Sequence, residues 1–169
     1  MKDLKSLAKN IKLVCVDVDG TLTDGQYMVS SDDKVLKTFY TRDFYGLEIL
    51  QSEDIHIAIV TSSKDDCILA KVMHLPMPAK AHMRLYTNIQ QKKIHVGGII
   101  IAMKIGWENV AYVGDAENDL ECLKSAGISA CPSDAIDEVR ASVDFLSKFA
   151  GGKGCVYDFS KYLLSLRKA

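Results

Sequence analysis

The chain has 169 residues, of which 48% are hydrophobic and 25% are charged, the composition of a globular protein with one domain-sized core. Its formal net charge of −1 provides no electrostatic surface for nucleic acid or an anionic membrane. The longest apolar run, Ile99 to Met103, is too short to cross a bilayer, and the polar segment 1–10 lacks the apolar core of a signal peptide. The five cysteines are odd in number and form no C-x-x-C pair, so we expect reduced thiols and a cytoplasmic location.

Segments typical of strands and of helices alternate along the first half of the chain. In order, the patterns predict a strand over 11–16, a hairpin over about 26–40, a helix over 43–54, a strand over 55–60 and a helix over 65–75. Residues 76–83 are expected to form a loop, because two prolines two positions apart exclude a helix.

The same alternation continues in the second half. A short strand is expected over 84–89, and the segment 92–105 is ambiguous because its glycine pair and isoleucine run disfavour a helix while its length favours one. The remaining patterns predict a strand over 110–115, a helix over 117–127, a strand over 128–131, and helices over 134–143 and 156–168. This order predicts an α/β fold with a doubly wound, mainly parallel sheet, in one domain over residues 1–169.

Polar side chains follow three of the predicted strands. Asp17 and Asp19 come after the first strand, Thr61 comes after the second, and Asp115 and Asp119 come after the third. Each group alone fits a turn or a helix N-terminus, but ligands of such sheets bind beyond the carboxyl ends of the strands. Carboxylates that converge there need a cation to neutralise them, and oxygen ligands without His or Cys point to Mg²⁺.

A carboxylate beside Mg²⁺ can attack phosphorus and form an aspartyl-phosphate that water later removes. A second acid two positions along the chain could protonate the leaving alkoxide and then deprotonate water. Thr61 would offer a hydroxyl to a phosphoryl oxygen, and a lysine would offset the negative charge. The three polar strand ends therefore predict phosphoryl transfer.

The stretch "DVDGT", Thr61, a downstream lysine and "GDAEND" resemble the four ordered motifs of the haloacid dehalogenase (HAD) superfamily. The stretches "DVDGTLTDG", "YMVSSDDKVLKTFYTRDFYGLEIL", "ENVAYVGDAENDLECLKSAGIS" and "AGGKG" narrow the resemblance to its capless phosphatases, over roughly residues 8–165. That subgroup acts on 3-deoxy-D-manno-octulosonate 8-phosphate (KDO-8-phosphate) or on 9-phosphates of sialic-acid-like nonulosonates. The resemblance implies a Rossmann-like HAD fold without a cap domain and with one protruding hairpin at about 26–40.

Carried over by position, the resemblance implies that Asp17 is the nucleophile and Asp19 the general acid and base. It implies that the Asp17 carboxylate, the Asp19 backbone carbonyl and Asp115 hold Mg²⁺. Asp119 would orient Lys92 or metal-bound water.

The resemblance assigns the phosphoryl group to Thr61 and Lys92, although the adjacent Lys93 leaves the choice of lysine open. The stretch between the second motif and this lysine is also several residues longer than the family pattern.

Substrate contacts are implied for Arg42, Ser62, Lys64 and Lys153, in part where the chain departs from the family. The family often reads Thr-Gly-Arg-Lys where this chain has Thr-Ser-Ser-Lys over 61–64, and Gly-Gly-Arg-Gly where it has Gly-Gly-Lys-Gly over 151–154. Lysine and arginine are not equivalent for carboxylate recognition, so these changes leave the sugar acid open. The family's hairpins join subunits and cover neighbouring sites, which implies a homotetramer.

Other readings fit less well or remain open. A receiver domain carries its acid pair and its phosphoacceptor on different strands, and the G-x-x-x-x-G-K-[ST] pattern of a P-loop is absent from the sequence. A broad sugar-phosphate phosphatase and a non-catalytic oligomerisation or regulatory relative remain alternatives to the sugar-acid phosphatase.

Overall fold

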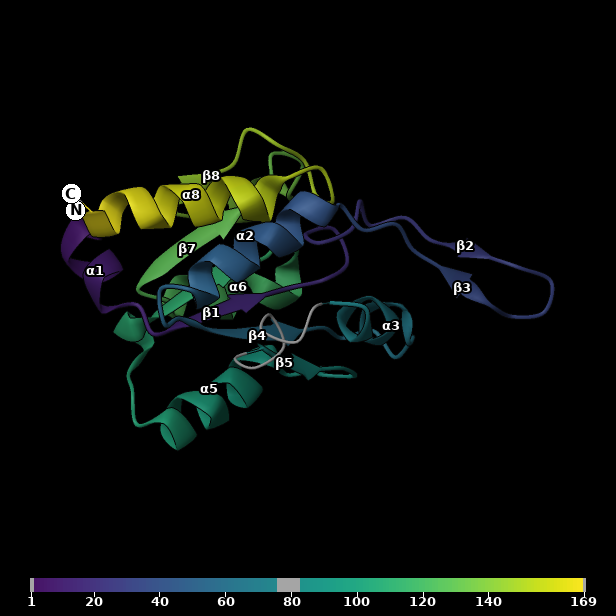
Figure 1. Ribbon diagram of the computed structural model, residues 1–169, viewed down its shortest axis with the longest axis horizontal. Helices are drawn as coiled ribbons and strands as arrows, with labels where there is room; N and C mark the ends of the chain where they lie inside the picture. The colour runs from purple at the N-terminus through teal and green to yellow at the C-terminus, as the bar shows by residue number, and fades with distance from the viewer. Residues whose placement is uncertain (1, 76–82, 169) are drawn as a thin grey trace.

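The computed structural model describes residues 2–75 and 83–168, and its centre is one parallel sheet (Figure 1). The six strands pair in the order β5-β4-β1-β6-β7-β8. They are β1 Leu13–Val16, β4 His56–Val60, β5 Met83–Tyr86, β6 Val110–Val113, β7 Ile128–Cys131 and β8 Phe145–Leu146. Every pairing is parallel, which confirms the α/β fold predicted from the sequence. β8 has no counterpart in that prediction, because two residues are too few to form a pattern.

β1 lies at the centre of the sheet, between β4 and β6. All four of its residues are buried, because helices cover both faces of a parallel sheet and its central strand must be apolar throughout. From β1 the chain first builds β4 and β5 on one side and then β6, β7 and β8 on the other. The carboxyl ends of β1 and β6 therefore flank the point where the strand order reverses, where ligands bind in open α/β sheets.

Helices pack on both faces of the sheet (Figure 1). One face is covered by α1 Leu4–Asn10, α2 Thr41–Gln51, α3 Cys67–Met73 and α8 Cys155–Lys168. The other is covered by α5 Lys92–Met103, α6 Leu120–Ser125 and α7 Asp137–Arg140, with short 3-10 helices η1 Trp107–Asn109 and η2 Glu117–Asp119. The five cysteines are free thiols. Among the described residues, no helix has the length and apolar character needed to span a membrane.

The structure settles or changes several of the predicted elements. The ambiguous segment forms α5, whose buried residues Lys92, Val96 and Ile100 recur every four positions and so share one face of a helix. The polar N-terminal segment contains α1, which begins where the carboxylate of Asp3 accepts the N–H of Ser6 at 3.2 Å. The helix predicted over 134–143 shortens to α7, and 76–82 of the predicted loop lie outside the described residues.

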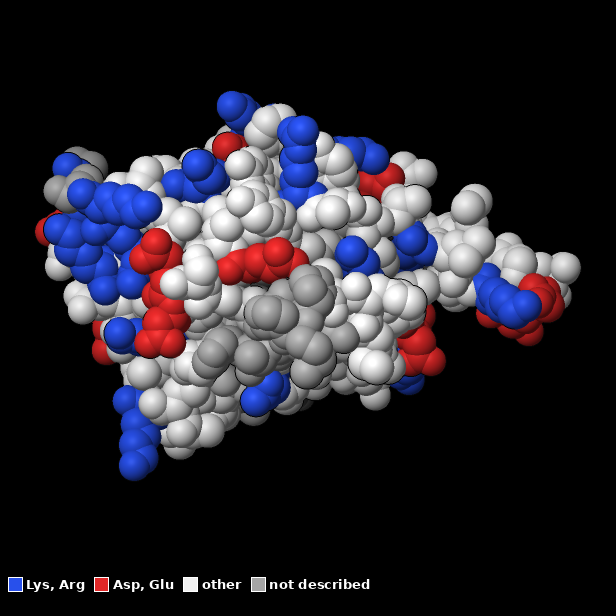
Figure 2. Space-filling model, viewed as in Figure 1, with Lys and Arg blue, Asp and Glu red and all other residues white. Residues whose placement is uncertain are grey.

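The hairpin predicted at about 26–40 is confirmed and projects from the body of the molecule (Figure 1). Its strands β2 Met28–Val29 and β3 Val35–Leu36 pair antiparallel. Its apolar residues Tyr27, Met28, Val29 and Leu36 are between 56% and 66% exposed. In Figure 2 the outer end of the hairpin carries charged side chains of both signs, and the part between this end and the body is mostly uncharged. The hairpin thus presents an apolar surface to solvent.

Candidate active site

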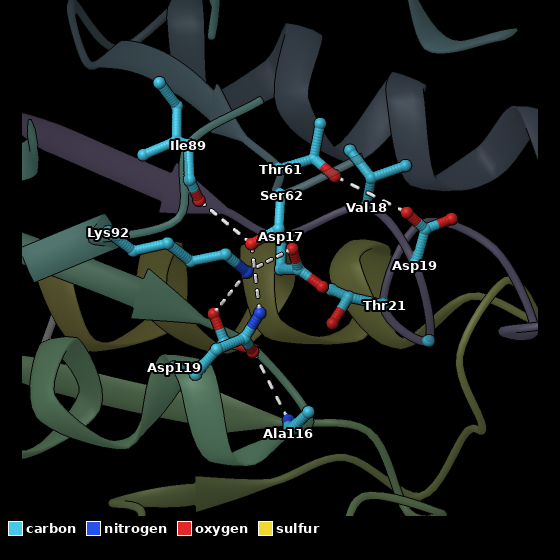
Figure 3. A network of polar contacts seen from close by, with 12 residues as sticks. Asp17, Val18, Asp19, Thr21, Thr61, Ser62, Ile89, Lys92, Ala116 and Asp119 are labelled. Atoms are coloured by element: carbon cyan, nitrogen blue, oxygen red, sulfur yellow. Dashed lines mark hydrogen bonds and ion pairs between the residues drawn. The ribbon is translucent and has the colours of Figure 1, made fainter. Parts of the chain in front are cut away.

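Three aspartate side chains, of Asp17, Asp115 and Asp119, meet at the carboxyl edge of the sheet. Figure 3 shows two of them, Asp17 and Asp119, on either side of Lys92. Asp17 directly follows β1, and its N–H donates to Val113 of β6 at 3.0 Å, which continues the sheet pairing to this residue. Asp115 and Asp119 follow β6. One carboxylate oxygen from each of the three lies within 4.8 Å of the other two, a grouping that could hold a metal ion. The structure thus brings together three of the four carboxylates expected at the strand ends, and Asp19 lies outside this group.

Lys92, the first residue of α5, lies between two of these carboxylates. Its Nζ is 2.5 Å from Oδ1 of Asp17 and 2.8 Å from Oδ1 of Asp119, and its side chain is buried. Burial disfavours the ammonium ion, but the two adjacent carboxylates prevail and raise the pKa of Lys92 above its usual value. The neighbouring Lys93 is exposed. The phase of α5 thus directs Lys92 to the site and Lys93 to solvent.

The carboxylate of Asp119 is fully occupied by hydrogen bonds. Its Oδ1 accepts from Lys92 at 2.8 Å and from the hydroxyl of Tyr112 at 2.7 Å. Its Oδ2 accepts the backbone N–H groups of Asp115 at 3.2 Å and Ala116 at 3.4 Å. With four donors in place, Asp119 has little capacity left for a metal ion, although it belongs to the cluster of three. The contact between Tyr112 and Asp119 could not be predicted from the sequence, because Tyr112 belongs to none of the motifs.

The surroundings of Asp17 and Asp115 disfavour the negatively charged forms of both side chains. Burial, followed by the charge of Asp119, raises the pKa of Asp17 well above its usual value. The same two causes raise the pKa of Asp115 to about 6, although the hydroxyl of Thr21 donates to its carboxylate at 3.0 Å. Lys92 supplies one positive charge against three carboxylates. The donor set, made of carboxylate oxygens alone and short of positive charge, fits a hard divalent cation.

Two glycines allow the backbone to approach the site closely. Gly20 has a φ of +93°, and a Cβ added there would lie 2.1 Å from Oδ2 of Asp115. A Cβ on Gly151 would lie 1.9 Å from the carbonyl oxygen of Gly20. The glycine-rich tail therefore packs against the loop that follows β1, although about 130 residues of chain separate the two.

Asp19 lies at the mouth of the site, and its side chain is 36% exposed. Its Oδ2 accepts from the hydroxyl of Thr61 at 3.4 Å, and its Oδ1 is 2.6 Å from Nζ of Lys37, the residue after β3. Lys37 also contacts Oδ2 of Asp65 at 2.5 Å. Sequence reasoning missed Lys37 and Asp65, because the contact exists only once the base of the hairpin has folded onto the strand ends.

A cavity of about 500 Å³ opens beside Asp19, lined by Asp19, Gly25, Tyr27, Val35, Lys37, Ser62, Ser63 and Asp65. The hydroxyl of Ser62 donates to the carbonyl of Ile89 at 2.9 Å (Figure 3). It also accepts from the side-chain amide of Asn118 at 3.2 Å. Asn118 has no counterpart among the predicted site residues. The cavity thus joins the loop after β1, the loop after β4 and the base of the hairpin.

The other predicted substrate residues lie outside the lining of this cavity. Arg42 is exposed at the start of α2, with its guanidinium carbon 6.0 Å from the centre of the Tyr40 ring. Lys64 is exposed in the loop after β4. Lys153 is exposed and its Nζ is 3.5 Å from the carboxylate of Asp24.

Three comparisons place the chain among known proteins. A family model for haloacid dehalogenase-like hydrolases matches residues 79–158. The 3-deoxy-D-manno-octulosonate 8-phosphate phosphatase KdsC of Escherichia coli is 32% identical over 167 residues, which cover 96% of this chain and 84% of that protein. The N-acylneuraminate cytidylyltransferase of Oncorhynchus mykiss is 31% identical over 94% of this chain but only 36% of its own length.

The fold has a close counterpart among solved structures. The 3-deoxy-D-manno-octulosonate 8-phosphate phosphatase of Moraxella catarrhalis, in complex with a magnesium ion, a phosphate ion and KDO, has a TM-score of 0.90. It is 28% identical, and the match covers 99% of this chain and 94% of that one. The likeness suggested by the motifs thus extends over sequence and structure alike, and the chain belongs to the haloacid dehalogenase-like hydrolases, in the family of the 3-deoxy-D-manno-octulosonate 8-phosphate phosphatases.

Proposed function

We propose that this chain is a Mg²⁺-dependent phosphatase that hydrolyses the phosphate ester of a 2-keto-3-deoxy sugar acid, with KDO-8-phosphate as the first candidate. The observation that carries the proposal is the buried contact between Lys92 and Asp17, next to Asp115. A lone structural ion pair would need no third carboxylate beside it. The substrate class comes from relatives that are named as KDO-8-phosphate phosphatases and that match most of this chain.

The metal would be held by the carboxylates of Asp17 and Asp115 and by the backbone carbonyl of Asp19. When bound, Mg²⁺ would neutralise the phosphoryl oxygens and the excess charge of the carboxylates. Asp119, whose oxygens already accept four hydrogen bonds, would act as the partner that orients Lys92.

The chain's own groups would divide the reaction into two steps. A carboxylate oxygen of Asp17 attacks phosphorus while Asp19 gives a proton to the leaving sugar oxygen, which leaves an aspartyl-phosphate. Asp19 then takes a proton from the water that attacks this phosphoryl group, and Asp17 is released. Thr61 and Lys92 would hold the phosphoryl oxygens, because they present a hydroxyl and an ammonium beside Asp19 and Asp17.

Asp17→Asn tests this mechanism, because the amide keeps the shape of the side chain and removes the nucleophile. We expect Mg²⁺-dependent release of 4-nitrophenol from 4-nitrophenyl phosphate by the wild type, and a loss of about 10³-fold or more in kcat in the variant. Asp54→Asn, an isosteric change before β4 at the opposite edge of the sheet, is the matched control. Full activity of folded Asp17→Asn would refute the aspartyl-phosphate mechanism.

The resemblance of the motifs implies a second substrate class, the 9-phosphates of sialic-acid-like nonulosonates. The match to part of an N-acylneuraminate cytidylyltransferase supports this class, because that protein is named for a sialic acid. A panel of KDO-8-phosphate, nonulosonate 9-phosphates and simple sugar phosphates separates the alternatives by kcat/KM. Similar values for every ester would identify a broad sugar-phosphate phosphatase. A folded protein that is inert toward the whole panel with Mg²⁺ present would identify a non-catalytic relative.

Ser62 would contact the substrate within the cavity, whereas the exposed Arg42, Lys64 and Lys153 would meet the part of the sugar acid that extends beyond it. If one of these cations binds the substrate carboxylate, its replacement by methionine raises KM for KDO-8-phosphate. The same change leaves KM for 4-nitrophenyl phosphate, which has no carboxylate, unaltered. Equal changes of KM for both esters would contradict carboxylate recognition.

We also propose that the protein acts as a homotetramer in the cytoplasm. The projecting hairpin exposes the apolar side chains of Tyr27, Met28, Val29 and Leu36, which a second copy would cover. Assembly would also shield the cavity beside Asp19, over which the described residues place no inserted domain. Light scattering tests the oligomeric state. Met28→Asp is expected to yield smaller species, whereas Ile101→Asp, at an exposed position of α5, should leave the mass unchanged. A monomeric wild type would refute the tetramer.

A further inference from the structure

Lys37 connects the hairpin to two other elements of the chain. It directly follows β3, yet its side chain is only 4% exposed, because its ammonium group lies between Asp19 and Asp65. Nζ is 2.6 Å from Oδ1 of Asp19 and 2.5 Å from Oδ2 of Asp65. A lysine with two carboxylate partners and almost no solvent contact is held in one place, and its ion pairs are weakly screened by salt.

Asp65 is itself held in place from the start of α3. Its Oδ1 accepts the backbone N–H of Cys67 at 3.1 Å, and its Oδ2 accepts the hydroxyl of Ser63. These hydrogen bonds fix the Asp65 carboxylate, and Asp65 therefore provides a fixed ion-pair partner for Lys37. No step of the proposed phosphatase mechanism uses Asp65.

Asp19 depends on Lys37 for its orientation. Of its two carboxylate oxygens, Oδ1 contacts Lys37 at 2.6 Å and Oδ2 accepts from Thr61 at the long distance of 3.4 Å. These are the contacts found for the Asp19 carboxylate within the described part of the chain. Without Lys37, the half-exposed Asp19 would keep one weak hydrogen bond and gain rotamer freedom.

We propose that Lys37 is a positioning residue: held by Asp65, it fixes the Asp19 carboxylate beside Thr61 and so couples proton transfer to the packing of the hairpin base against the strand ends. The inference rests on the proposed function, in which Asp19 is the general acid and base. Displacement of a catalytic group by about 1 Å can cost about 100-fold in rate, so an orienting contact of this kind has a measurable effect.

The two steps of the reaction place different demands on Asp19. In the first, the bond from Asp17 to phosphorus forms, the bond from phosphorus to the ester oxygen breaks, and an alkoxide leaving group needs the proton of Asp19. 4-Nitrophenolate is stable as an anion and departs without that proton. In the second step, water forms the new bond to phosphorus, its proton passes to Asp19, and the bond to Asp17 breaks for every ester alike.

This difference gives Lys37→Met a distinctive signature in rapid-mixing experiments with 4-nitrophenyl phosphate and Mg²⁺. We expect a burst of one nitrophenolate per active site, followed by turnover about 10–100-fold slower than in the wild type, because the phosphoenzyme now accumulates. With KDO-8-phosphate we expect a similar loss in kcat with little change in KM and no accumulation. A change that merely loosened the hairpin would produce no burst.

Three further variants make the result specific. Lys34→Met alters an exposed lysine of the same hairpin that pairs with Asp32, and it should behave as the wild type. Lys37→Arg keeps the cation and should restore most of kcat. Asp65→Asn weakens the ion pair that holds Lys37 while leaving Lys37 in the chain. It should give the same burst with a smaller loss of kcat, and it provides the test if Lys37→Met does not fold.

Asp19→Asn separates this inference from the proposed function. A burst in Asp19→Asn without one in Lys37→Met or Asp65→Asn would overturn the role of Lys37 and leave the phosphatase mechanism intact. Wild-type turnover by Asp19→Asn would overturn the mechanism itself. A raised KM for KDO-8-phosphate with unchanged kcat in Lys37→Met would make Lys37 a substrate-binding residue and would also refute the positioning role.

Discussion

Replacement of Lys92 by methionine tests the charge balance of the site. The substitution keeps an unbranched side chain of similar length but removes the ammonium group that lies 2.5 Å from Asp17 and 2.8 Å from Asp119. Asp17, Asp115 and Asp119 would then stand within 4.8 Å of one another without the ammonium that now lies between two of them. We expect the variant to be markedly less stable than the wild type when no divalent cation is present.

The expected size of the effect follows from the burial of the pair. Removal of one partner from a buried ion pair costs about 3–5 kcal/mol of unfolding free energy. For a chain of this length, about 2–4 °C of melting temperature corresponds to each kcal/mol, so we expect a loss of about 6–20 °C. The loss should lie toward the lower end, because burial already raises the pKa of Asp17 and lets this carboxyl take up a proton.

Calorimetric melting in EDTA and in excess Mg²⁺ provides the measurement. A ligand at 100 times its Kd stabilises the folded state by about 2.7 kcal/mol, so saturating Mg²⁺ should raise the melting temperature of both proteins. The matched control is Lys93→Met, at the exposed neighbouring position, which should shift the melting temperature by about 2 °C at most. Equal melting of Lys92→Met and the wild type in EDTA would refute the charge argument.

Three other substitutions test the geometry around the site. Gly20→Ala would place a Cβ 2.1 Å from Asp115 at a φ of +93°, so we expect loss of Mg²⁺-dependent turnover, and wild-type activity would contradict the close approach. Asp43→Ala leaves three backbone N–H groups at the start of α8 without their acceptor and should cost about 3–5 kcal/mol in urea unfolding; a loss below about 1 kcal/mol would contradict it. Tyr112→Phe removes the 2.7 Å hydrogen bond to Asp119 and should lower the unfolding free energy by about 1–2 kcal/mol; an unchanged unfolding free energy would contradict this contribution.

Much of the fold and the acidic half of the site could be predicted from local sequence patterns. The strands β1, β4, β6 and β7 are short apolar runs, and the residues after a parallel strand always emerge at the same edge of the sheet. Asp17 and Asp115 therefore had to meet once the strand order was known. The helix α5 was harder to predict, because Gly97 and Gly98 weaken the local preference for a helix. Tertiary packing stabilises the helix despite this weak preference.

Tertiary structure alone decided which cations reach the carboxylates. Lys92 and Lys93 are adjacent in the sequence, and only the rotational position of α5 on the sheet buries one and exposes the other. Lys37 reaches Asp19 because the base of the hairpin packs against the strand ends, and no periodicity encodes this contact between residues 18 positions apart. Local patterns report which face of an element is apolar, whereas the direction of a polar side chain at a site depends on how distant elements pack.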